Sequence, residues 1–93
     1  MSNKITRKKL RSLRNDICIQ YLIADVLKQP HKISEGHFRF LCPVCREFDT
    51  AVNKKTNLAR CFRCNKNFNP IDMVIVEENC SFLEAVDFLL SLL

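Results

Sequence analysis

Four of the six cysteines in this 93-residue chain form two matching pairs. Each pair has the spacing Cys-x-x-Cys, and fifteen residues separate Cys45 from Cys61. Two residues between paired thiols allow one tight turn to direct both sulfurs at the same point, and two such turns supply the four thiolates of a closed tetrahedral site. The pattern predicts one structural zinc ion held by Cys42, Cys45, Cys61 and Cys64.

Three other chemistries compete for these cysteines. Two disulfides would suit a secreted protein, but the N-terminus shows no uninterrupted apolar signal core, and cysteines in an intracellular protein more often bind metal. A thioredoxin-like redox pair explains one Cys-x-x-Cys and leaves the other without a role. Iron in a rubredoxin-like site has the same sulfur coordination, but a glycine usually follows each pair there, whereas Arg46 and Asn65 follow here. His37 is a fifth candidate ligand, and because structural zinc takes four ligands we expect it at the surface.

The length of the chain makes a metal physically useful. Ninety-three residues form one small domain with a marginal core, so a bound metal would supply part of the folding free energy. The sequence contains no run of about 18 apolar residues, which excludes a membrane-spanning helix within it.

Charge is distributed unevenly along the chain, which has a net charge of +5. Residues 1–14 carry six Lys or Arg and no acid, and residues 71–93 carry five acids and no base. Residues 37–70 carry seven bases against Glu47 and Asp49. This polarity suggests a nucleic-acid-binding face on one side, although charge runs alone are often only solvated surface.

The first element expected before the cysteines is a helix. Apolar residues recur at three- and four-residue steps from Leu10 to Tyr21, which predicts one amphipathic helix over residues 6–28. Gln29-Pro30 ends it, because the residue before a proline avoids helical angles. Its basic first turns are expected to be exposed, and Cys18 is expected to be a buried apolar side chain.

Short strands should carry both knuckles. Ser34-Glu35-Gly36 predicts a turn, and alternating polarity predicts a half-buried strand over residues 37–41. Residues 48–53 and 58–62 predict the two strands of a hairpin, with Lys54 and Lys55 displayed at its tip. The knuckles and the hairpin together predict a zinc ribbon.

Two helices should follow the ribbon. Asn69-Pro70 predicts a helix start, and Ser81 with Glu84 has the capping-box form of a second start. Cys80 between them is expected to be a free thiol. The expected inward side chains are Ile71, Val74 and Ile75 in the first helix and Phe82, Ala85, Val86, Leu89 and Leu90 in the second. The predicted fold class is α+β, a zinc ribbon flanked by an N-terminal helix and two C-terminal helices.

This order of parts resembles the N-terminal zinc-binding domain of bacterial-type DNA primases and bacteriophage primase-helicases. The resemblance covers roughly residues 15–93, with residues 1–14 as a basic arm or helix start. It is carried by Cys42-Pro43-Val44-Cys45, Cys61-Phe62-Arg63-Cys64, Pro70-Ile71-Asp72-Met73-Val74 and Ser81-Phe82-Leu83-Glu84-Ala85-Val86. Bacterial members usually have His where Cys45 stands, so the four-cysteine set is of the phage type. Residues 47–52 and 65–68 depart from the family pattern, so the resemblance implies the fold but not the family's preference for particular template sequences.

The resemblance implies a module that grips single-stranded DNA template and presents the first nucleotides to a separate polymerase domain. That separate domain holds Mg²⁺ through acidic residues. The acids of this chain, Asp72, Glu77, Glu78, Glu84 and Asp87, look instead like the solvent faces of two helices. We therefore expect no enzyme activity from this chain alone. The implied setting is the cytoplasm of a bacterial or phage-encoded system, with a primase catalytic domain or replicative helicase as partner and no membrane.

Two functions remain open. In the first, basic side chains contact phosphates, and Phe48 or Phe62 stacks on an unpaired base unless it belongs to the core. The candidate nucleic-acid contacts are Arg39, Arg46, Lys54, Lys55, Arg60, Arg63, Lys66, Phe48 and Phe62. In the second, the ribbon is a protein–protein adaptor whose acidic C-terminal helices dock on replication or transcription machinery.

Overall fold

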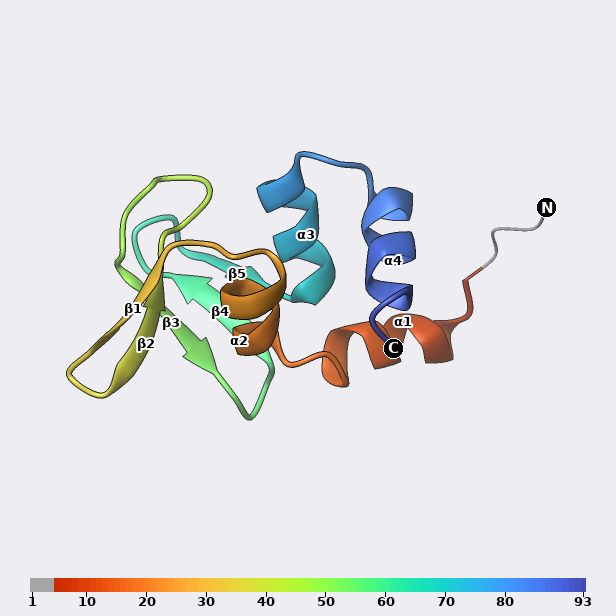
Figure 1. Ribbon diagram of the computed structural model, residues 1–93, viewed down its shortest axis with the longest axis horizontal. Coiled ribbons are helices and arrows are strands. Elements are labelled where there is room, and N and C mark those ends of the chain that lie inside the picture. Colours follow the sequence, from red (N-terminus) through yellow and green to blue (C-terminus); the bar gives the residue numbers. More distant parts are fainter. Residues whose placement is uncertain (1–4) are drawn as a thin grey trace.

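The computed structural model describes residues 5–93 (Figure 1). The elements in chain order are α1 (Arg7–Asn15), α2 (Ile19–Tyr21) with a π-helical turn (Leu22–Val26), β1 (His31–Ser34), β2 (His37–Phe40), β3 (Thr50–Asn53), β4 (Leu58–Cys61), β5 (Lys66–Phe68), α3 (Pro70–Glu78) and α4 (Phe82–Leu90). Strands β1 and β2 form one antiparallel sheet, and β3, β4 and β5 form another. With its four-cysteine cluster this is the expected α+β architecture, consistent with a zinc ribbon. Lys4 of the predicted basic arm lies outside the described residues.

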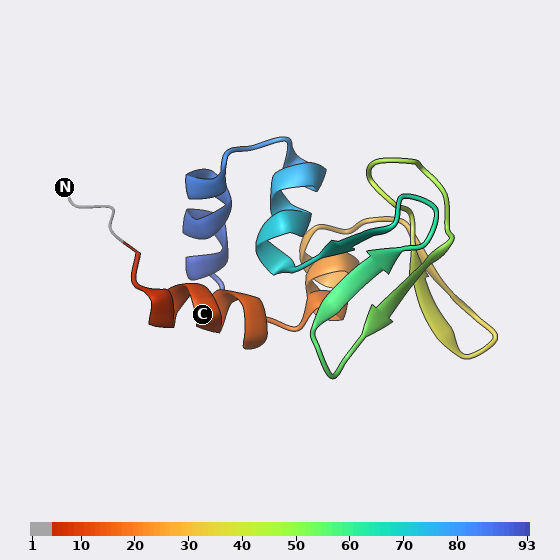
Figure 2. The ribbon, with the colours of Figure 1, turned by 180° about the vertical axis from the view of Figure 1, so that it is seen from behind.

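The two sheets and the helices occupy opposite ends of an elongated molecule of 47 × 25 × 23 Å. Figures 1 and 2 show α1, α3 and α4 at one end, the strands at the other and α2 between them. One buried cluster joins the ends, with side chains from every layer: Leu13, Ile19, Leu22, Ile23, Phe40, Ala59, Phe68, Ile71, Met73, Val74, Ala85, Val86 and Leu89. No helix in the part of the chain from Ile5 to Leu93 is long and apolar enough to cross a membrane.

The prediction of one continuous N-terminal helix is wrong. The chain leaves α1 after Asn15 and restarts at Ile19, and the exposed Cys18 between them is not the buried side chain expected. A side chain from the β3–β4 turn occupies the break: the Asn57 amide donates to the carbonyl oxygens of Arg14 and Ile17, both at 2.7 Å. Its Oδ1 accepts from the Ile19 N–H at 2.9 Å. These backbone groups, which a continuous helix would pair internally, are satisfied from outside.

The hairpin predicted at the ribbon is present, with Thr50 opposite Cys61 and Asn53 opposite Leu58. Its first strand begins at Thr50, two residues later than predicted, and β1 and β5 were not predicted. Thr50 is buried and joins the two sheets, because its hydroxyl donates to the Phe40 carbonyl at 2.7 Å and accepts from the Phe40 N–H at 2.9 Å. The β1–β2 hairpin is thereby attached to the ribbon through a side chain.

Both C-terminal helices begin as predicted. The Asn69 side chain accepts from the Asp72 N–H at 2.8 Å and the Asp72 carboxylate from the Asn69 N–H at 3.1 Å. Ser81 and Glu84 repeat this reciprocal pattern at the start of α4. The expected inward residues are buried or half-buried except Phe82, which is 46% exposed. Phe82 is the first residue of α4, and helical side chains lean toward the N-terminus, so its ring projects beyond the packed part of the helix.

Candidate metal centre

The first knuckle follows β2 directly. After Cys42 the chain turns back through residues 43–45, and Arg46 adopts a left-handed φ of 62°. The Arg46 N–H donates to the Cys42 carbonyl at 2.9 Å, and the Cys42 N–H donates to the Glu47 carbonyl at 3.0 Å. The Val44 N–H lies 3.4 Å from the Cys42 sulfur. This tight turn orders the backbone around both sulfurs.

The second knuckle repeats the geometry between β4 and β5. Cys61 is the last residue of β4, the Cys64 N–H lies 3.4 Å from the Cys61 sulfur, and Asn65 takes a left-handed φ of 55°. The left-handed position after each pair thus holds a residue other than glycine. Asparagine tolerates this conformation readily, whereas at Arg46 it costs about 1 kcal/mol.

The two knuckles bring all four predicted ligands together. The sulfurs of Cys42, Cys45, Cys61 and Cys64 lie within 4.8 Å of one another. The closest contacts cross between knuckles, at 3.5 Å from Cys45 to Cys61 and 3.8 Å from Cys42 to Cys64. Four sulfurs placed tetrahedrally about 2.3 Å from a central ion would stand about 3.8 Å apart. All six cysteines, which fall within the described residues, are free thiols. The prediction of a four-cysteine metal site is confirmed as an arrangement of ligands.

The thiols of the cluster differ in their pKa values. Cys42 and Cys61 are buried, and Cys45 and Cys64 are half-buried. Removal from water, with hydrogen bonds to neighbouring thiols, raises the pKa of Cys45 and raises the pKa of Cys64 to about 12. Burial alone would raise the pKa of Cys61. The pKa is lowered on balance, because the Cys64 N–H and the neighbouring thiols donate hydrogen bonds to the Cys61 sulfur. A metal ion must therefore displace protons from Cys45 and Cys64.

The donor set limits what the site can do. Four sulfurs without a carboxylate or imidazole fit a tetrahedral ion such as zinc or iron. Four protein ligands leave no open position for a water or substrate, which suits a structural role. His37 is exposed at the start of β2 and is not part of the cluster, as expected.

Two of the candidate nucleic-acid residues meet on the outer face of the β3–β4–β5 sheet. Ala51, Arg60 and Asn67 are neighbours across the three strands. The Arg60 guanidinium donates to the amide oxygens of Asn65 and Asn67, both at 3.2 Å, and lies 5.7 Å from the centre of the Phe62 ring. That ring is 48% exposed, so it is not a core residue.

These side chains border a groove of about 430 Å³, which we call the sheet groove. It is lined by Ala51, Val52, Asn53, Thr56, Leu58, Arg60, Phe62 and Asn67. Lys54 and Lys55 are exposed at the hairpin tip beside it, and Arg63 and Lys66 are exposed around the second knuckle. The structure thus gathers an aromatic ring, a guanidinium and amide groups on one open surface next to the metal cluster.

The other candidates have partners away from the sheet groove. Arg39 donates to the Thr50 carbonyl at 2.8 Å. Phe48 is half-buried, with the Lys32 ammonium 4.8 Å above its ring. Arg46 lies close enough to Glu77 to lower the pKa of that carboxyl, although burial and Glu78 raise it on balance. None of these three lines the sheet groove.

Sequence reasoning missed Asn65, Asn67 and Asn57. For Asn65 a signal was present, since asparagine directly after a Cys-x-x-Cys pair is suited to a left-handed turn. Asn67 follows two residues later and so points to the same side of the chain as Asn65. Asn57 gave no comparable signal, because its partners lie about forty residues earlier.

Comparisons with protein-family models, with curated proteins and with solved structures found no match to this chain. The resemblance to primase zinc-binding domains rests on the motifs quoted above.

Proposed function

We propose that this protein is a zinc-stabilised module that binds single-stranded DNA, as the primase resemblance implies, and has no polymerase site of its own. The observation that carries the proposal is the sheet groove, an open surface where Phe62 is half-exposed beside Arg60 and two amide side chains. Phe62, which lines this groove, follows the ligand Cys61 directly in the chain and so connects the groove to the four-cysteine cluster.

Zinc is the ion that best suits this role. It takes four thiolates in a closed tetrahedron, has no redox chemistry and contributes directly to folding. Cys61 ends β4, and Lys66 of β5 pairs with it, so an ion bound at Cys61 and Cys64 holds both strands at the end that carries Phe62. The metal thereby orders the binding surface without taking part in chemistry.

The chemistry of the sheet groove favours unpaired bases. Stacking of one base on an aromatic ring contributes about 1–3 kcal/mol, and a duplex hides its base faces. The Arg60 guanidinium donates to phosphates or base edges, and Asn65 and Asn67 offer both donors and acceptors. Lys54, Lys55, Arg63 and Lys66 surround the groove with positive charge that attracts the backbone.

Two of the five acids of the C-terminal helices have structural roles, which supports a module without a polymerase site. Asp72 and Glu84 accept hydrogen bonds at their own helix starts, which gives each a structural role. In the family that the chain resembles, Mg²⁺ and nucleotide transfer belong to a separate domain. This module would hold template for such a partner.

The test is a comparison of fluorescence anisotropy titrations with a labelled single strand and with the same sequence as a duplex. Phe62→Ala should weaken single-strand binding by about 5- to 150-fold, from the stacking energy of 1–3 kcal/mol. Phe82→Ala is the matched control, because Phe82 is similarly exposed but lies on α4. Equal, weak and salt-insensitive binding of both DNA forms would rule the proposal out.

A second candidate, the protein–protein adaptor, is favoured by one observation. Phe82 and Leu83 are 46% and 53% exposed at the start of α4, beside the acidic Glu84. Charge reversal at Lys54, Lys55 and Arg60 separates the functions: loss of DNA retention supports DNA binding, whereas intact DNA binding with a lost protein partner supports the adaptor.

A further inference from the structure

Helix α1 carries a basic face that the proposed binding surface does not include. Leu13 is buried and Leu10 half-buried on its inner side, while all its bases are exposed: Arg7, Lys8, Lys9, Arg11 and Arg14. Residues three and four apart are neighbours on a helix, so Lys8, Arg11 and Asn15 form one row and Arg7 and Arg14 flank Arg11. Lys9 lies off this row.

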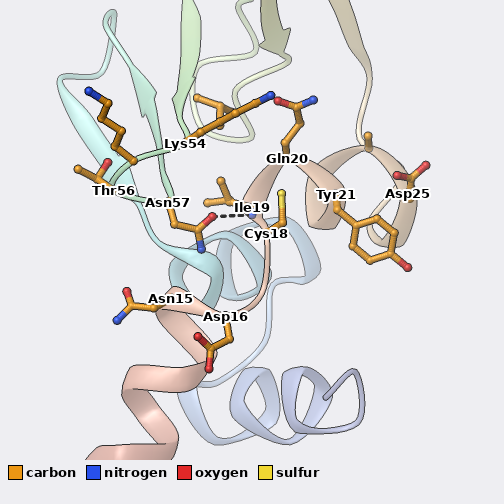
Figure 3. Close-up of a pocket in the computed structure, with 13 residues that line it drawn as sticks. Asn15, Asp16, Cys18, Ile19, Gln20, Tyr21, Asp25, Lys54, Thr56 and Asn57 are labelled. Carbon is orange, nitrogen blue, oxygen red and sulfur yellow. Dashed lines mark hydrogen bonds between the residues drawn. The ribbon is translucent and has the colours of Figure 1, made fainter.

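This row leads into a hollow between α1, α2 and the β3–β4 turn. The hollow has a volume of about 560 Å³ and is lined by Asn15 from α1, by Lys54, Lys55 and Thr56 from the turn, and by Cys18 and Tyr21 near α2 (Figure 3). Asn15 is one helical turn beyond Arg11, so the basic row ends at the hollow that the two turn lysines also line. Asn57 fixes this junction through its hydrogen bonds to Arg14, Ile17 and Ile19.

The same hollow adjoins the sheet groove. Val52 and Thr56 line both, so the two depressions meet at the β3–β4 turn. A continuous surface therefore runs from Phe62 and Arg60, past Lys54 and Lys55, and onto α1. Figures 1 and 2 show α1 and the strands on opposite sides of α2, so this surface joins the helical part of the molecule to the sheets.

We propose that a DNA strand held in the sheet groove continues past the β3–β4 turn and along α1, with its phosphates on a basic track. The basic track comprises Arg7, Lys8, Arg11 and Arg14 of α1 and Lys54 and Lys55 of the turn. The proposal rests on the proposed function, and adds a second, sequence-independent contact to it.

The exposed side of α1 distinguishes nucleic acid from a membrane surface. Helices that bind membranes bury an apolar face in the lipid, whereas Leu10 and Leu13 of α1 face the protein core. α1 itself contains no acid. Asp16 and Asp25 also line the hollow, and Figure 3 shows Asp25 beyond Tyr21, away from Lys54 and Thr56. Asp16 lies beside Asn15 at the end of the α1 row, so only the charge of Asp25 directs a phosphate backbone to the lysine side.

The dimensions set the length of strand that each part holds. Strand β4 has four residues at about 3.3 Å each, which leaves room for at most about four nucleotides, since the charges of one strand stand about 3.4 Å apart when its bases stack as in a duplex and further apart when it is extended. The long axis of 47 Å matches at most about 14 nucleotides. An oligonucleotide of at most about four nucleotides should therefore occupy the sheet groove alone, and one of about 14 should also reach α1.

The test measures binding of oligo(dT) of these two lengths by anisotropy across a fourfold range of salt. Arg11→Gln and Lys9→Gln form a matched pair, since each removes one exposed charge from α1 and only Arg11 lies on the basic track. Arg11→Gln should weaken binding of the long strand, Lys9→Gln should not, and neither should change binding of the short strand. The double variant Arg7→Gln/Arg11→Gln should reduce the slope of log affinity against log salt concentration by about 1.4, because each lost phosphate contact removes about 0.7. When salt is raised fourfold, the wild type should therefore lose about sevenfold more affinity than the double variant.

Equal binding of the long strand by the Arg11→Gln and Lys9→Gln variants would overturn the proposal. The proposal would also be overturned if the double variant no longer bound phosphatidylserine vesicles but still bound the long strand as the wild type does. If Phe62→Ala leaves short-strand binding intact, the sheet groove is not the binding surface, and the matched pair still decides the contact on α1. A wild type that binds neither length would refute both. Metal content measured for each variant confirms that it is folded.

Discussion

Asn57 gives the sharpest test of how the fold is assembled, because one amide joins the helical end to the ribbon. Asn57→Gly removes three hydrogen bonds and leaves the left-handed backbone, with φ of 56°, unstrained. At about 0.5–1.5 kcal/mol for each bond, the expected loss of unfolding free energy is about 3 kcal/mol. Asn57→Ala should cost about 1 kcal/mol more, because alanine disfavours a positive φ.

The measurement is urea unfolding with the metal held in constant excess, since any ligand of the folded state shifts apparent stability. Asn53→Ala is the matched control in the same turn: its exposed side chain accepts only from the Lys55 and Thr56 N–H groups. It should cost less than about 1 kcal/mol. If Asn57→Gly and Asn53→Ala have the same small effect, Asn57 does not hold the break between α1 and α2.

Three further perturbations test other parts of the structure. Thr50→Val keeps the shape of the side chain but loses both hydrogen bonds to Phe40, so it should lower the free energy of unfolding by about 1–3 kcal/mol. An unchanged midpoint of urea unfolding would contradict the attachment of the two sheets through Thr50. Gln29→Met should stabilise the protein by about 1 kcal/mol or more, because both polar atoms of the buried Gln29 side chain lack a partner within residues 5–93; a lower melting temperature would refute this. Metal affinity should fall as pH is lowered, because protons compete for the thiolates of Cys45 and Cys64, whose pKa values are raised. Each proton that the metal displaces contributes about a tenfold fall per pH unit, and a pH-independent affinity in a chelator competition would contradict the assignment.

The metal site could be predicted from the sequence because each knuckle is local. Two residues between paired cysteines define a turn wherever it occurs, and only the meeting of the two turns requires the fold. The starts of α3 and α4 were equally local, since Asn69 and Ser81 bond to groups three residues away. These features depend on short-range geometry, which residue types and spacing encode directly.

The features that were missed depend on distant partners. The apolar period continues from Leu13 to Ile17 across the break after α1, and the group that stabilises the break is Asn57, from another part of the chain. β5 has three residues and β1 follows directly on a proline, so neither shows an alternating pattern long enough to recognise. The exposure of Phe62 likewise depends on which face of the sheet the helices leave open.

We infer that one zinc ion, bound by four thiolates, holds the two knuckles together and so forms the surface beside them. Native mass spectrometry of the protein purified under reducing conditions, with elemental analysis of the same sample, tests it most directly. We expect one zinc per chain, a Cys45→Ser variant that binds it far more weakly, and unfolding of the ribbon when a chelator removes it. A metal-free protein that keeps its fold, or stoichiometric iron in place of zinc, would contradict it.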